Sequence, residues 1–148
     1  MKSTRRSAAM AVLSGTALAA APQAGAAGKQ VHNRRPKQQD GPAPLYSEAV
    51  SYNGFVFVSG NGVNDVQGVT AQTTKVLDNI KGALENAGSS MEKVVKCNVY
   101  LANIDDYAAM NEAYRGRFGN QPPVRTTVAV AAIPLKGCLV EIDVVAGR

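Results

Sequence analysis

Arg125 stands in a segment that otherwise suits a β-strand, Pro123-Val124-Arg125-Thr126-Thr127-Val128. Burying a guanidinium there without a partner would cost several kcal/mol, on the order of other uncompensated buried charges. The side chain must therefore lie at a rim, pair with a carboxylate or bind an anionic ligand. Its planar fork of N–H donors suits bidentate binding of a carboxylate.

Two acidic side chains follow in the next predicted strand, Leu139-Val140-Glu141-Ile142-Asp143. Glu141 and Asp143 are two residues apart, so they lie on the same face of that strand. An ion pair between Arg125 and Glu141 on neighbouring strands is one interpretation. A ligand site that uses both groups is the other, and the pattern alone does not decide between them.

The scarcity of histidine and cysteine narrows the chemistry further. The 148 residues include one histidine, His32, and two cysteines, Cys97 and Cys138. The absence of histidine from residue 43 onward excludes Ser-His-Asp, Cys-His and His-ligated metal chemistry there. The two cysteines could form a disulfide or remain as two buried thiols, and neither is assigned a catalytic role.

The net charge of +5 is concentrated near the N-terminus. Residues 1–42 contain seven Lys and Arg side chains and one acid, Asp40. Residues 43–148 contain nine basic and ten acidic side chains, a net charge of −1. This balance argues against a nucleic-acid-binding domain, which would carry a basic surface.

The N-terminal segment is typical of an export signal. Basic residues at positions 2, 5 and 6 precede the apolar run Ala8–Ala21 and the small residues Ala24-Gly25-Ala26. This order predicts a cleavable signal peptide over residues 1–26, with a periplasmic or secreted location and no stable membrane anchor. A disordered or helical N-terminal extension is the alternative.

Residues 27–42 have the composition of a flexible linker, with Gly, Pro, Gln and charged residues and no apolar periodicity. The cluster Arg34-Arg35-Pro36-Lys37 could bind an anionic surface, although no aromatic residue is interleaved. A solvated tether is the simpler interpretation. One globular domain is expected over residues 43–148.

The elements of that domain follow from hydrophobic periodicity and turn residues. Asn53-Gly54 predicts a type I′ hairpin turn between two strands, because both positions of that turn require positive φ. Thr70 is the expected N-cap of the first helix and Gly88 its C′ residue. The expected strands are 46–52, 55–59, 94–101, 124–132 and 139–145, and the expected helices are 70–87 and 105–118.

The resulting order, β-β-α-β-α-β-β, predicts an α+β fold in which two helices cover one face of a single sheet. The run Phe55-Val56-Phe57-Val58 is apolar throughout, so both faces of that strand should be covered. The sequence contains no further layer. We therefore expect a partner subunit to cover the second face.

Seven segments resemble the Rid family, the reactive intermediate deaminases also called the YjgF family. The Pro123-Val124-Arg125 and Leu139-Val140-Glu141-Ile142 segments resemble its C-terminal signature. The other matching segments are Tyr46-Ser47-Glu48-Ala49-Val50, Val58-Ser59-Gly60, the helix around Leu77-Asp78-Asn79-Ile80, the strand 94–101 and Asn111-Glu112-Ala113-Tyr114. The resemblance covers residues 43–148.

The resemblance implies a chorismate-mutase-like, RidA-like protomer and a homotrimer with sites in the clefts between subunits. It implies a deaminase without a metal or organic cofactor. Such an enzyme hydrolyses enamine and imine acids, such as 2-aminoacrylate, to 2-keto acids and ammonia. The expected partners are that small-molecule substrate and further copies of the chain, and not nucleic acid.

The family's site residues map onto six positions of this chain. Arg125 matches the arginine that binds the substrate carboxylate, and Glu141 matches the acid that orients water or moves a proton. The expected substrate-binding residues are Tyr46, Gly60, Thr127 and Asn111. Tyr46 could instead be an ordinary strand aromatic, Gly60 a turn glycine and Asn111 a helix-surface or capping residue.

Three positions depart from the common family pattern. Thr126-Thr127 replaces Ser-Cys after the arginine, Asn61 replaces a common Gln, and Leu45 replaces a Pro or Gly before the tyrosine. Thr127 keeps a backbone carbonyl to hold a water molecule but lacks the thiol. The arginine is retained, so these departures bear on substrate preference. Two alternatives to the deaminase stay open: a non-catalytic trimer that binds small carboxylates, and an endoribonuclease or translation inhibitor.

Overall fold

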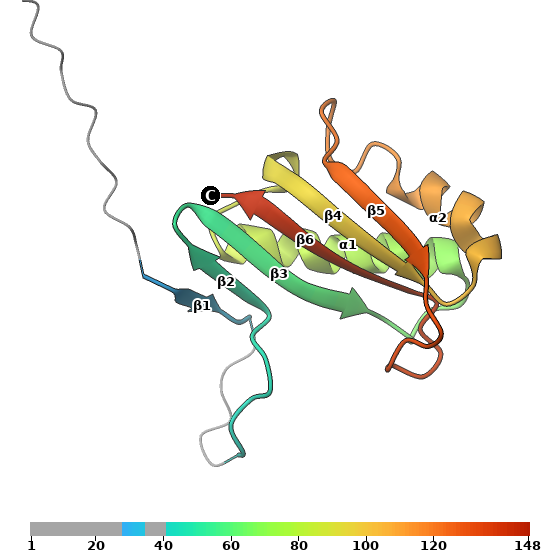
Figure 1. Ribbon diagram of the computed structural model, residues 1–148, viewed down its shortest axis with the longest axis horizontal. Coiled ribbons are helices and arrows are strands. Elements are labelled where there is room, and N and C mark those ends of the chain that lie inside the picture. The colour runs from blue at the N-terminus through green and yellow to red at the C-terminus, as the bar shows by residue number, and fades with distance from the viewer. Residues whose placement is uncertain (1–27, 35–40) are drawn as a thin grey trace, which may run out of the picture.

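The computed structural model describes residues 28–34 and 41–148, which form one sheet with two α-helices (Figure 1). The strands are β1 (Gln30–His32), β2 (Ala49–Tyr52), β3 (Phe55–Gly62), β4 (Val94–Leu101), β5 (Val124–Ala129) and β6 (Val140–Gly147). The α-helices are α1 (Val69–Asn86) and α2 (Tyr107–Tyr114), and short 3-10 turns precede β4 (Met91–Lys93) and α2 (Ile104–Asp106). The strand order in the sheet is β1-β2-β3-β6-β4-β5.

The β2–β3 hairpin forms as its turn residues predict. Asn53 has φ of 48° and Gly54 has φ of 80°, so both central positions have the positive φ that a type I′ turn requires. The strands then pair in antiparallel register, with Ala49 opposite Val58. The Asn-Gly turn thus sets which residues of β3 face the helices.

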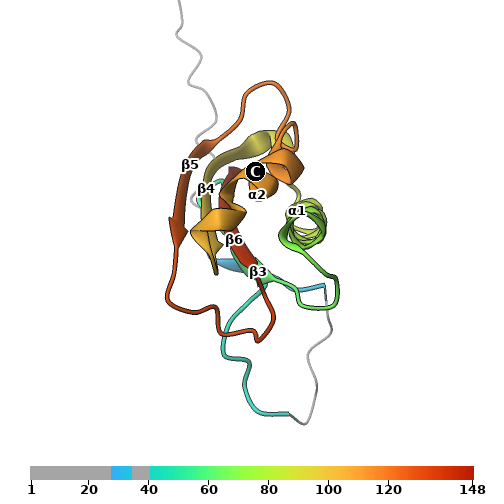
Figure 2. The same cartoon turned by 90° about the vertical axis from the view of Figure 1, so that its right-hand side faces the viewer.

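Both helices lie on one face of the sheet, which confirms the predicted α+β architecture (Figure 2). Val76, Ile80 and Leu84 recur every four residues along α1 and are fully buried. They pack with the inward side chains of β6, whose alternating burial places Ile142 and Val144 in the same core. Side chains spaced by the helical period on α1 and by the strand period on β6 therefore pack together in one hydrophobic layer.

Strands β4 and β5 are parallel, and α2 provides the crossover between them. A crossover between parallel strands packs its helix back onto the sheet. The element order thus brings α2 close to the edge strand β5, which carries Arg125.

The structure corrects several predicted boundaries. Helix α1 begins at Val69 with Gly68 at its N-cap, so the prediction of Thr70 as the N-cap is wrong. Gly88 is the predicted C′ residue, with φ of 78°. The second helix ends at Tyr114 and not at Phe118, because Arg115 leaves helical geometry and Gly116 takes φ of 75°. The last two strands also shift, and β5 stops at Ala129.

Strand β1 is an element that the sequence did not predict. It lies within the expected linker and pairs with β2, with His32 opposite Ala49. A side-chain contact supports it, because Nε2 of His32 lies 2.9 Å from Oγ of Ser51. The predicted signal peptide and residues 35–40 of the linker lie outside the described residues.

The sheet's second face is open in the protomer. Tyr52, Phe55 and Phe57 are 51%, 47% and 43% exposed there. This chain therefore covers one face of strand β3, as expected. Coverage of the other face by a partner subunit stays a prediction. In the described part of the chain, no helix combines the length and apolar character needed to cross a membrane.

Candidate functional site

Arg125 lies on the helix-covered face of the sheet. Its register partner on β4 is Cys97, which in turn lies opposite Val144 of β6. Cys97 and Val144 are both buried in the core, and register partners project to the same face. The Arg125 side chain therefore points toward α2 from the edge of the sheet, where it is half-buried.

Two tyrosines of α2 surround the guanidinium of Arg125. Its Cζ lies 4.6 Å from the centroid of the Tyr114 ring and 5.8 Å from that of Tyr107. One Nη2–H also donates a hydrogen bond to the Tyr107 hydroxyl, at 3.3 Å. Aromatic faces attract a guanidinium through cation–π interactions. No carboxylate forms an ion pair with Arg125 in the part of the chain that the structure describes.

Two titratable groups beside Arg125, the Cys97 thiol and the Tyr114 hydroxyl, are neutral at neutral pH. Burial raises the pKa of the Cys97 thiol to about 11. Burial also raises the pKa of the Tyr114 hydroxyl. Neither group therefore supplies a negative charge at neutral pH, and none of the described residues provides a counter-ion for Arg125.

Two predicted substrate-binding residues share this location. Thr127 follows Arg125 on the same face of β5, and its Oγ1 is buried without a hydrogen-bond partner among the described residues. Asn111 lies on α2 four residues after Tyr107 and three before Tyr114, so the three share one helix face. Arg125, Thr127 and Asn111 are called the arginine group below.

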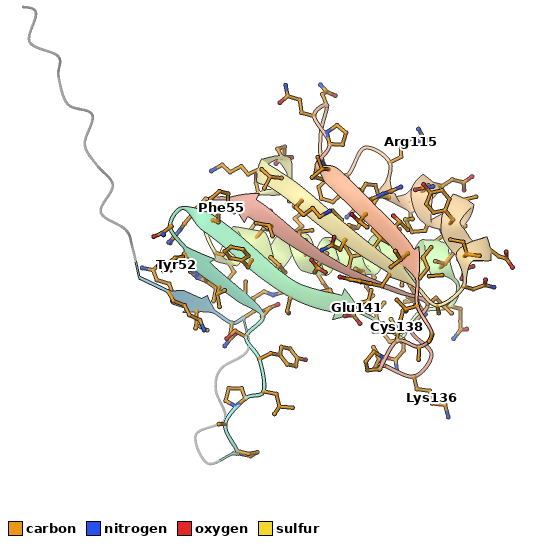
Figure 3. The ribbon with its side chains drawn as sticks, in the orientation of Figure 1. Tyr52, Phe55, Arg115, Lys136, Cys138 and Glu141 are labelled. Atoms are coloured by element: carbon orange, nitrogen blue, oxygen red, sulfur yellow. The ribbon has the colours of Figure 1, made fainter. Side chains whose placement is uncertain are left out.

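Glu141 lies on the opposite face of the sheet. Its neighbours in sequence, Val140 and Ile142, are buried among the helices, so Glu141 projects toward the open face. Asp143 projects to the same side, as its spacing predicts, and accepts a hydrogen bond of 2.9 Å from Asn98. Glu141 lies near the end of β3, close to Cys138 (Figure 3).

Gly60 is adjacent to the carboxylate of Glu141. A Cβ atom added at Gly60 would lie 2.1 Å from Oε1 of Glu141. The register between β3 and β6 shifts between Val58 and Asn61, which places Gly60 at an irregularity of the strand. The missing side chain of Gly60 leaves room for the carboxylate in this position, and a larger residue would require the carboxylate to move.

Tyr46 lies near Gly60 rather than near Arg125. Both line a hollow of about 1000 Å³ between the segment before β2 and the end of β3, together with Ser59, Asn61 and Asn79. The side chain of Tyr46 is 76% exposed. Glu141, Gly60 and Tyr46 are called the glutamate group below.

One protomer therefore does not bring the six predicted residues together. The arginine group lies on the helix side of the sheet, and Glu141 lies on the open side. Strand β4 also separates β5 from β6. The interpretation of Arg125 and Glu141 as an ion pair between neighbouring strands is wrong, because these strands are not neighbours.

The two cysteines are both free and buried, so the alternative without a disulfide is the one that forms. Cys97 lies on β4 beside Arg125, and Sγ of Cys138 packs where a side chain at Gly62 would lie. Within residues 28–34 and 41–148, no cluster of three His, Cys, Asp or Glu side chains is placed to hold a metal ion.

The family model described as Endoribonuclease L-PSP matches residues 37–147. The chain belongs to the endoribonuclease L-PSP family. A relative in Schizosaccharomyces pombe, Protein mmf2, is 44% identical over 110 residues, which cover 70% of this chain and 87% of that protein.

Solved structures of the L-PSP family share the fold. RidA from the Antarctic bacterium Psychrobacter sp. PAMC 21119 is 36% identical, with a TM-score of 0.67 over 73% of this chain and 92% of that chain. Rv2704 of Mycobacterium tuberculosis, a member of the YjgF/YER057c/UK114 family, is 29% identical, with a TM-score of 0.72 over 81% of this chain and 99% of that chain. The resemblance to the Rid or YjgF family is therefore confirmed.

The predicted periplasmic or secreted location is wrong. Two L-PSP relatives, mmf2 and mmf1 of Schizosaccharomyces pombe, are named as mitochondrial proteins. The residues that suggested export lie within 1–26, outside the described residues. A basic start followed by an Ala-rich run is therefore not sufficient to identify an export signal here.

Sequence reasoning missed the two tyrosines that hold Arg125. A signal was present, because Tyr107 and Tyr114 are seven residues apart and lie on one face of the predicted helix. That helix precedes the strand of Arg125. A crossover geometry would have placed its tyrosines over that strand.

Proposed function

We propose that this L-PSP family protein hydrolyses reactive enamine and imine acids, of the 2-aminoacrylate type, to 2-keto acids and ammonia. The observation that carries the proposal is the unpaired cation of Arg125 between two tyrosine rings. A guanidinium stacked on aromatic faces keeps in-plane N–H donors available for a planar carboxylate. Similarity to a RidA protein supports the same assignment.

Hydrolysis of an imine requires few catalytic groups from the protein, because the imine carbon is already electrophilic. The enamine 2-aminoacrylate tautomerises to its imine, 2-iminopropanoate, whose C2 is electrophilic. Water adds to C2 as the imine nitrogen takes up a proton, which gives a carbinolamine. The C–N bond then breaks, ammonia leaves and the hydroxyl loses its proton, which leaves pyruvate. Binding the carboxylate, placing one water molecule and moving a proton are the tasks of the site.

The residues divide these tasks. Arg125 binds the carboxylate, and Glu141 orients the water or transfers the proton. Thr127 and Asn111 contact the substrate beside Arg125, and Tyr46 and Gly60 line the cleft beside Glu141. None of these steps uses a metal or an organic cofactor.

Such a site requires more than one copy of the chain. Arg125 and Glu141 project to opposite faces of one sheet, so one substrate cannot contact both within a protomer. A second copy that packs its own open face against the edge strand β5 of the first would bring its glutamate group to the arginine group there. The exposed Tyr52, Phe55 and Phe57 supply an apolar surface for that contact. We propose a homotrimer with its sites between subunits.

The decisive experiment follows keto-acid release from enzymatically generated 2-aminoacrylate. We expect Arg125→Ala to lower kcat/KM at least about 100-fold, because positioning supplies most of the catalysis. Arg125→Lys is the matched control, since it keeps the charge but loses the bidentate fork, and should retain more activity than Arg125→Ala. Equal activity of the wild type and Arg125→Ala would refute the assignment. Thermal stabilisation by pyruvate without turnover would instead identify a carboxylate-binding protein.

An endoribonuclease is the second candidate, and the description of the family model favours it. The balanced charge of residues 43–148, nine basic against ten acidic side chains, opposes it because RNA binding draws on positive charge. RNA cleavage that persists through stringent purification and falls with added salt would support the ribonuclease. Cleavage that separates from the protein would exclude it.

A further inference from the structure

The arrangement around Arg125 carries an inference about how the arginine is oriented. The guanidinium has five N–H donors, and one of them is used by the Tyr107 hydroxyl at 3.3 Å. Its Cζ lies over the Tyr114 ring, 4.6 Å from the ring centroid. The hydrogen bond and the ring contact together restrict rotation of the group.

A carboxylate partner would restrict the guanidinium as well, but it would occupy the donors and neutralise the charge. The two tyrosines restrict the group while occupying one donor, and they leave its charge in place. Tyr107 is 43% exposed, whereas Tyr114 is 8% exposed. The buried ring thus forms a fixed platform, and the hydroxyl of Tyr107 lies at the accessible side, where a ligand would approach.

We propose that Tyr107 is a positioning residue that holds the guanidinium of Arg125 in the orientation that binds the substrate carboxylate. The inference rests on the proposed function, because it assigns the arginine a carboxylate ligand. The chemical class of ligand that fits is a small planar monocarboxylate, since one guanidinium with its open donors provides one bidentate contact. Tyr107 itself does not touch the reacting atoms.

The backbone position of Tyr107 limits where its hydroxyl can reach. Tyr107 is the first residue of α2, directly after the 3-10 turn Ile104–Asp106. The side chain of Asn103 caps that turn by accepting from the Asp105 N–H at 3.1 Å. A capped turn followed by a helix fixes the backbone of Tyr107, and so fixes where its hydroxyl can reach.

The test compares Tyr107→Phe, which removes the hydroxyl and keeps the ring, with Tyr107→Leu, which removes both. We expect Tyr107→Phe to raise KM and the Kd for pyruvate about three- to tenfold, the loss of about one hydrogen bond, with kcat changed less than about twofold. Tyr107→Leu should raise both constants further. Thr74→Val removes an exposed hydroxyl on α1, which bonds the Thr70 carbonyl of its own helix, and is the control.

A second measurement does not depend on turnover. Nitrogen-15 NMR of the guanidinium, assigned by its loss in Arg125→Lys, reports rotation of the NH₂ groups. We expect rotation in Tyr107→Phe to be faster than in the wild type and in Thr74→Val. Equal rotation rates in the wild type and Tyr107→Phe would overturn the inference, even if the deaminase activity is present.

The two measurements also separate the inference from the proposed function. A wild-type protein that neither hydrolyses 2-aminoacrylate nor binds pyruvate would refute the function. Slow rotation lost in Tyr107→Phe would still establish that Tyr107 orients the arginine. Slow rotation together with unchanged KM and Kd in Tyr107→Phe would overturn the role in carboxylate binding.

Discussion

The two faces of the sheet differ in how completely the rest of the same chain covers them. On the helix-covered face, Val56 of β3 and Ile142 and Val144 of β6 are at most 1% exposed. On the open face, Phe55 and Phe57 of β3 are almost half exposed. The side chains of β3 therefore alternate between the buried core and the exposed face, with a period of two residues.

The charged site residues divide between the same two faces. Arg125 lies against tyrosines on the helix side, and Glu141 lies on the open side beside Gly60. The proposed function therefore depends on another copy of the chain that supplies the missing half of the site.

A complementation experiment tests this division most strongly. Arg125→Ala and Glu141→Gln should each be nearly inactive alone. Mixed and refolded together, they should recover about a quarter of the wild-type activity if every site joins two subunits of a closed ring. The measurement is keto-acid release from the mixture, with each variant refolded alone as the control. A mixture no more active than its components would place both residues in one protomer's site.

Gly60→Ala tests the glutamate half alone. The new methyl group would lie within 2.1 Å of Oε1 of Glu141, so the carboxylate must move. A displacement of about 1 Å can cost up to about 100-fold in rate, and we expect a loss of at least about tenfold. Gly28→Ala is the matched control, because nothing lies within 4 Å of a Cβ there. A fully active Gly60→Ala would show that the position of Glu141 is not critical.

Two substitutions compare the faces, one through the stability of the fold and the other through the assembly of the oligomer. Leu77→Ala removes a fully buried side chain of α1 and should lower the free energy of unfolding by about 2–5 kcal/mol in urea titrations. Phe57→Asp places a charge on the open face and should dissociate the oligomer, as measured by light scattering. If Phe57→Asp assembled like the wild type, the open face would not be the subunit contact.

The smallest effect concerns pH. Burial raises the pKa of Cys97 from 9.0 to about 11, so the folded state favours the neutral thiol. The resulting stability is present below pH 9 and is lost as pH rises from 9 toward 11, by roughly 1.4 kcal/mol per pKa unit. Urea titrations at pH 8, 9 and 10 should show this fall. Cys97→Ala should flatten it, and an unchanged slope would assign the loss to other groups.

Much of the local structure could be predicted from the residues. The Asn53-Gly54 turn, the helix with Val76, Ile80 and Leu84, and the strand 94–101 follow from turn chemistry and periodicity, which act over a few residues. The six site residues came from a family resemblance that the comparisons confirm. The end of α2 was missed because Arg115 and Gly116 leave the helix within an otherwise helical pattern.

The sequence by itself determined the α+β class, the two helices and the identity of the lone strand arginine, because apolar periods and a charge among β-formers are local signals. Only the tertiary structure decided which residues meet. It placed β4 between β5 and β6, set the tyrosines of α2 against Arg125 and put Gly60 against Glu141. These contacts depend on strand order and register across the whole sheet, which no short window of residues specifies.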